Sequence, residues 1–157
     1  MRRRLPGDHV FWAALLALIA VLVVTVKFHA ALPALADFVL VTLVVLAAFL
    51  TLLQLAPLVI LSLYIMNWQP AFGAEAWVLL LAPFVCWGVL RLIAWRPWAS
   101  SALLALLSVA VFYLSNGWQV FVGQLGRAGW FALIDVIFAI LFFQVFNYFY
   151  APKAEGS

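Results

Sequence analysis

The sequence predicts an all-α fold: a polytopic integral membrane bundle of about five transmembrane helices, forming one domain over residues 1–157. Hydrophobic residues make up 70% of the chain and charged residues only 8%, whereas globular proteins carry roughly 25% charged residues. The apolar residues are gathered into five runs, most of them near the about 20 residues that cross a ~30 Å hydrocarbon core. Seven of the eight tryptophans lie at the ends of these runs, where amphipathic rings collect at the membrane–water boundary.

The first run covers residues 10–28 and follows the basic residues 2–4. Two interpretations compete, a retained helix and a signal peptide that is cleaved after Ala36. The sequence Ala34-Leu35-Ala36 has the small-residue pattern of a cleavage site. The apolar run is longer than the roughly 7–15 residues usual in a signal peptide, so we expect the helix to be retained.

The second run, residues 37–66, has no charged side chain after Asp37 and no glycine. A straight helix of that length would be about 45 Å long, which is more than a ~30 Å hydrocarbon core requires. The run is nevertheless too short for two crossings of about 20 residues each and the turn between them. Pro57 has no N–H to bond the carbonyl of Leu53, which predicts one long helix kinked at Pro57. We expect the face that carries Gln54 to point toward other helices, because lipid would leave its amide unpaired.

The third run, residues 75–95, carries Arg91 near its end, and the fourth run covers residues 98–115. The last run, residues 129–150, is rich in aromatic residues and contains Asp135. Small residues at helical spacing in the fourth run predict close contact with another helix: Ser101, Ala105 and Ser108.

The positive residues do not decide the orientation of five crossings. One side would hold Arg2, Arg3, Arg4 and Arg127, and the other Lys27, Arg91, Arg96 and Lys153. The rule that positive residues stay in the cytoplasm therefore gives no majority.

Four polar side chains within the apolar runs are candidates for function: Asp135, Gln54, Asp37 and Arg91. With five crossings, Asp37 and Arg91 lie at the same boundary, where an ion pair would lower the cost of burying either charge. Such a pair would line a substrate path, or it would be a structural clamp or two side chains that reach to the interface. We expect the structural interpretation.

Asp135 is the strongest of the four candidates, because an acid inside a membrane helix is a candidate for function by default. Arg127 and His9 are its expected partners on the same side, and pairing with Arg127 would make it an interface anchor instead. Gln144 follows nine residues later, about 180° around the helix. A proton path through this one chain is therefore not expected.

The sequence offers no further chemistry. The single cysteine, Cys86, excludes an intrachain disulfide and a multi-cysteine metal site. No nucleophile stands with a base, and no glycine loop carries a phosphate-binding lysine, so we expect no cofactor and no metal. An enzyme that acts on a lipid or a quinone is the less expected alternative, because it rests on the aromatic last run alone. The net charge of +3 reflects the basic cluster at residues 2–4 rather than a nucleic-acid site.

These observations predict a small protein of the bacterial inner (cytoplasmic) membrane, whose partners are the lipid bilayer and another membrane protein or further copies of itself. Its expected role is that of a non-catalytic accessory or scaffold subunit of a larger membrane complex. The alternative is a small oligomeric transporter or channel for an apolar or weakly polar solute, which would use Asp135 and Gln54.

Overall fold

The computed structural model describes residues 8–28, 36–66, 74–92, 97–115 and 125–150. These residues form six α-helices and contain no strand. The helices are α1 (Asp8–Phe28), α2 (Ala36–Leu46), α3 (Leu52–Met66), α4 (Ala74–Leu92), α5 (Pro97–Ser115) and α7 (Leu125–Tyr150).

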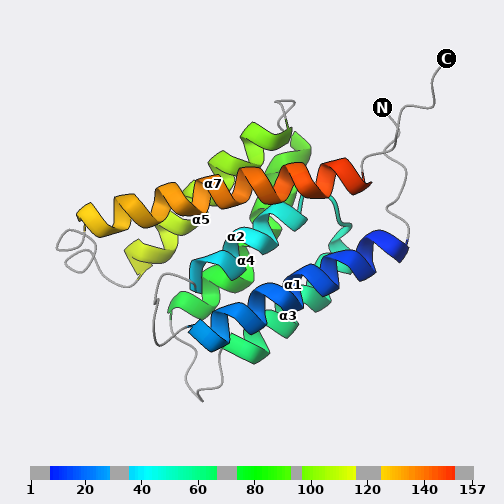
Figure 1. Cartoon of the computed structure of the whole chain (residues 1–157), viewed down its shortest axis with the longest axis horizontal. Helices are drawn as coiled ribbons and strands as arrows, with labels where there is room; N and C mark the ends of the chain where they lie inside the picture. The colour runs from blue at the N-terminus through cyan, green and yellow to red at the C-terminus, as the bar shows by residue number, and fades with distance from the viewer. Residues whose placement is uncertain (1–7, 29–35, 67–73, 93–96, 116–124, 151–157) are drawn as a thin grey trace.

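Consecutive helices run in opposite directions, so the bundle has two ends (Figure 1). At the first, called end A, α1 (blue) begins, α7 (red) ends, and α2 and α4 also end. At the second, called end B, α1 ends and α2, α4 and α7 begin. The start of the first helix and the finish of the last therefore lie on the same side of the molecule.

Helix α2 is the centre of the bundle. It contacts all five of the other helices, and every residue from 39 to 47 is buried. Valine, leucine and one threonine cover its whole circumference, which is typical of a helix enclosed by protein or lipid on every side. Here the other helices of the same chain enclose it.

The outer helices each have one buried and one exposed apolar face. In α1 the buried residues follow helical spacing: Val10, Ala14, Leu18, Leu22 and Thr25. Large apolar side chains lie exposed between them: Trp12, Leu16, Ile19, Val23 and Val26. The buried face of α1 covers α2 and α3, so the first helix is an integral part of this fold.

The prediction of a single helix over residues 37–66 is wrong, because this run forms two helices, α2 and α3. A hydrogen-bonded turn at residues 47–51 separates them, and α3 returns toward the end at which α2 began (Figure 1). At 1.5 Å per residue, α2 is about 16 Å long and α3 about 22 Å. The pair therefore forms a helical hairpin, hereafter the α2–α3 hairpin, rather than one long helix.

Pro57, the expected position of a kink in one continuous helix, lies inside α3. The helix is instead interrupted at residues 47–51, before Pro57 in the chain. The other four expected ranges coincide with α1, α4, α5 and α7 to within a few residues.

Two of the described helices are long and apolar enough to cross a membrane by length and composition, His9–Lys27 and Gly129–Phe149. Shorter apolar helices accompany them: Leu52–Met66, Ala76–Leu92 and Trp98–Val111.

Candidate functional site

The turn of the α2–α3 hairpin is closed by Thr51 and Gln54. The backbone N–H of Thr51 donates to Gln54 Oε1 at 3.2 Å, and the Thr51 hydroxyl donates to the same oxygen at 3.1 Å. A threonine followed three residues later by glutamine is the sequence of a capping box, of which the bond from the Thr51 N–H to the Gln54 side chain is one half. Gln54, expected to be a polar group facing neighbouring helices, therefore acts first as a cap for its own helix.

Backbone hydrogen bonds continue through the turn. The N–H groups of Ala48 and Phe49 bond three residues back, to Val45 and Leu46, and that of Leu50 also bonds to Leu46. Non-helical backbone is tolerated at membrane depth only where its polar groups are satisfied within protein or a water-filled cavity. The turn meets the first condition, because Leu50 is buried and its N–H is bonded.

Trp87 of α4 is hydrogen-bonded to the turn. Its indole Nε1–H donates to the backbone carbonyl oxygen of Leu50 at 3.1 Å. The guanidinium carbon of Arg91 lies 4.1 Å from the centre of the Trp87 ring, a cation–π contact. The one tryptophan inside an expected run thus has a structural partner that the sequence did not identify.

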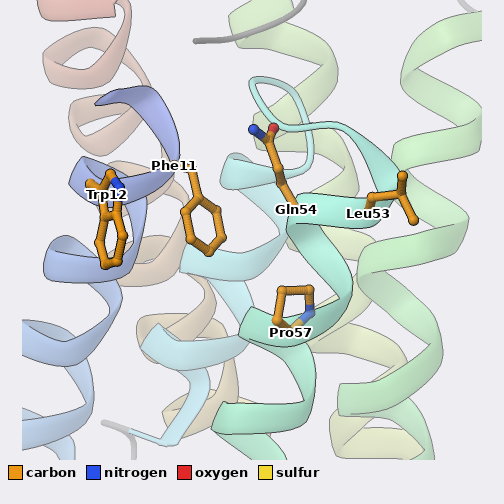
Figure 2. Close-up of a pocket in the computed structure, with 5 residues that line it drawn as sticks. All are labelled: Phe11, Trp12, Leu53, Gln54 and Pro57. Atoms are coloured by element: carbon orange, nitrogen blue, oxygen red, sulfur yellow. The ribbon is translucent and has the colours of Figure 1, made fainter. Parts of the chain in front are cut away.

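A shallow groove of about 360 Å³ lies between α1 and α3 beside this turn. Figure 2 shows Phe11 and Trp12 on α1, opposite Leu53, Gln54 and Pro57 on α3. Pro57 has no N–H to bond the carbonyl of Leu53, so two polar groups, this carbonyl and the Gln54 amide, lie near an otherwise apolar groove.

A second groove, of about 260 Å³, lies where α1, α2 and α7 meet. Its lining is almost entirely apolar: Ala20, Val21, Val24, Thr25, Phe38 and Phe138. The rings of Phe38 and Phe138 contact each other at a centroid distance of 4.7 Å.

The structure does not bring Asp37 and Arg91 together. Asp37 lies in the first turn of α2, at end B, whereas Arg91 lies in the last turn of α4, at end A (Figure 1). Arg91 stacks on Trp87, which bonds to the turn at the far end of α2 from Asp37. The expectation that they share one boundary depended on a single second helix.

Asp135 lies on the inner face of α7 and is only 2% exposed, with Oδ2 enclosed within the bundle. Ala139, Phe143 and Phe146 continue this buried face, and the last two rings contact Phe49 of the hairpin turn. His9 lies at end A, where α1 begins, while Asp135 lies in the half of α7 nearer end B. The side chain of Arg127, the other expected partner, lies outside the described residues.

The small-residue face of α5 is used inside the chain. Ser101 and Ala105 are fully buried, and the hydroxyl of Ser108 lies 3.5 Å from the thiol sulfur of Cys86 on α4. The hydroxyl oxygens of Ser101 and Thr42 are buried without a hydrogen-bond partner among the described residues. The bundle interior therefore contains several small polar groups within an apolar core.

Among the described side chains, no three His, Cys, Asp or Glu residues gather in a group that could hold a metal ion. Comparison of the chain with protein-family models, with curated proteins and with solved structures gives no match.

Proposed function

We propose that this chain is a multi-pass protein of the bacterial inner membrane and serves as a non-catalytic accessory or scaffold subunit within it. The observation that supports this proposal is the distribution of apolar side chains. Helix α2 is covered on all sides by protein, while the outer helices expose continuous stripes of large apolar residues.

Exposing such a surface to water would be energetically unfavourable. Contiguous apolar patches beyond a few hundred Å² are rare on soluble monomers and mark contacts with protein or membrane. The exposed stripes occur on α1, α3, α4, α5 and α7, around the whole bundle rather than on one face. A lipid environment accounts for a surface that is apolar in every direction, and a single docking site does not.

The contacts of the described polar groups support the scaffold role. Gln54 caps α3, Trp87 bonds to the hairpin turn, and Arg91 stacks on Trp87. These roles hold the fold together, and none of them sets a nucleophile beside a base.

Two experiments test the proposal in sequence. Membranes washed with alkaline carbonate should retain the chain, and release into the supernatant would exclude an integral protein. The chain extracted in mild detergent should then run as an assembly larger than its own 17.4 kDa. A monodisperse monomer, both in detergent and by subunit counting in native membranes, would contradict the scaffold role.

The second candidate function is an oligomeric transporter or channel, and the buried Asp135 favours it. This acid shares the interior with the hydroxyls of Thr42 and Ser101, which have no hydrogen-bond partner among the described residues. Intramembrane acids commonly mark substrate paths. Proteoliposomes should then show solute flux that falls at least tenfold in the Asp135→Asn variant. Flux that is unchanged by this substitution would exclude a transport role for the acid.

A further inference from the structure

Helix α7 carries two amides at exposed positions, whereas the one amide of α3, Gln54, is half-buried and caps its own helix. Its inner face consists of Asp135, Ala139, Phe143 and Phe146. Its outer face contains the exposed residues Trp130, Leu133, Ile137, Gln144 and Asn147. Two carboxamides therefore lie on the surface that the proposed function assigns to the bilayer.

Gln144 lies well within the apolar segment. It is five residues before the end of the stretch Gly129–Phe149, which is about 8 Å along a helix. Polar side chains in membrane helices almost always face other helices or a water-filled cavity. An amide that faces lipid lacks hydrogen-bond partners there, so its exposure indicates that another protein surface covers this face.

The outer residues of α7 also have the spacing of a helix–helix seam. Trp130, Ile137 and Gln144 are seven residues apart, and Leu133, Ile140 and Asn147 follow each of them by three. These are the a and d positions of a heptad repeat. The described exposed faces of α1, α4 and α5 have no Asn or Gln at comparable positions.

From this arrangement we infer that α7 forms a homodimer contact, with two copies of the chain packed in parallel about a twofold axis along the membrane normal. A residue close to such an axis meets its own counterpart. A carboxamide both donates and accepts hydrogen bonds, so Gln144 pairs with the partner's Gln144 and each amide satisfies the other. A partner of different sequence would need a separate complementary group at this depth.

The inference rests on the proposed membrane location and specifies self-association as the form that the scaffold role takes. It also explains why the small-residue face of α5 is not the interface. That face is already buried within the chain, at Ser101, Ala105 and Ser108. What remains for a second copy is a seam of large apolar residues with amides near one end.

The test counts subunits in native membranes, by single-molecule photobleaching of fluorescently tagged full-length chain. The unchanged protein should give two bleaching steps. Gln144→Leu should raise the dimer dissociation constant about tenfold, within the range expected for interhelical amide pairs. Gln144→Asn keeps an amide and should restore most of the dimer, whereas Val85→Leu, on the exposed face of α4, should have no effect.

Disulfide cross-linking locates the contact. In a Cys86→Ala background, Ile137→Cys should cross-link to a second copy under mild oxidation, and Val85→Cys should not. Single bleaching steps from the unchanged protein, or equal dimerisation in Gln144→Leu, would overturn the α7 contact. Preferential cross-linking through position 85 would do the same. Retention after the carbonate wash is read separately, so loss of the dimer is distinguished from loss of membrane insertion.

Discussion

The amide oxygen of Gln54 accepts two hydrogen bonds from Thr51, and this pair connects residue chemistry to the course of the chain. The first N–H groups of a helix have no intrahelical partner, and in an apolar environment water does not replace the missing acceptor. Gln54 Oε1 supplies an acceptor locally, for the N–H of Thr51. A polar residue in an apolar run therefore need not indicate a substrate path.

Replacing Gln54 by alanine removes this acceptor and leaves the N–H of Thr51 unsatisfied. We expect a loss of about 1 kcal/mol in unfolding free energy, measured as a lower thermal midpoint in detergent by circular dichroism. Leu53→Ala is the matched control, because Leu53 is 85% exposed. Equal destabilisation by the two substitutions would show that the cap contributes nothing.

Trp87 tests the other side of the turn. Trp87→Phe keeps an aromatic ring but deletes the N–H that bonds to Leu50, leaving a backbone carbonyl without this donor. The expected cost is about 1 kcal/mol. Trp98→Phe, on the exposed start of α5, should change the midpoint little, and a similar shift in both variants would count against the bond.

The exposed and buried faces of each outer helix decide how the elements assemble. On α1, Ala14 is fully buried and Leu16 is 67% exposed, although both are small or apolar residues of one uniform run. The small side chain at position 14 lets α1 approach the hairpin. This approach makes α1 a structural helix of the bundle, and we expect it to be retained in the mature protein.

The two positions should respond differently to the same side chain. Ala14→Phe forces bulk into the contact with the hairpin and should destabilise the bundle by roughly 1–3 kcal/mol. Leu16→Phe should be nearly neutral, because it faces outward. Thermal unfolding of both variants measures the difference, and intact-mass measurement of the mature chain shows whether residues 1–36 remain.

The α2–α3 hairpin adds one helix to the expected bundle, and this decides whether the two ends of the chain lie on the same side of it. With one helix in that run the two ends of the chain would face opposite sides, whereas the observed arrangement puts the start of α1 and the finish of α7 at end A (Figure 1). The segments attached at end A hold six of the eight positive residues: Arg2, Arg3, Arg4, Arg91, Arg96 and Lys153. End B has Lys27 and Arg127.

Positive residues favour the cytoplasmic side, so we expect end A to face the cytoplasm. Green fluorescent protein fused to the full chain before Met1 or after Ser157 should fluoresce in both fusions, and alkaline phosphatase at the same sites should be inactive. An active phosphatase at only one of the two sites would return the chain to an odd number of crossings.

The sequence by itself determined the all-helical character and most helix boundaries, because both depend on local composition. Runs of apolar residues separated by Gly, Pro and Asn mark helices wherever they pack. It also placed Gln144 on the face of the last helix opposite Asp135, since helical periodicity alone fixes that relation. The spacing Thr51-x-x-Gln54 is a local signal for the start of a helix inside the second run, and hence for the hairpin turn before it.

Only the tertiary structure decided where the second run turns and which polar groups meet. A break at Ala47 has no proline or glycine to mark it. It is stabilised by Trp87, a residue far along the chain, and by the helices that enclose α2. The separation of Asp37 from Arg91 follows from that turn. Contacts between distant segments carry this information, and local periodicity does not.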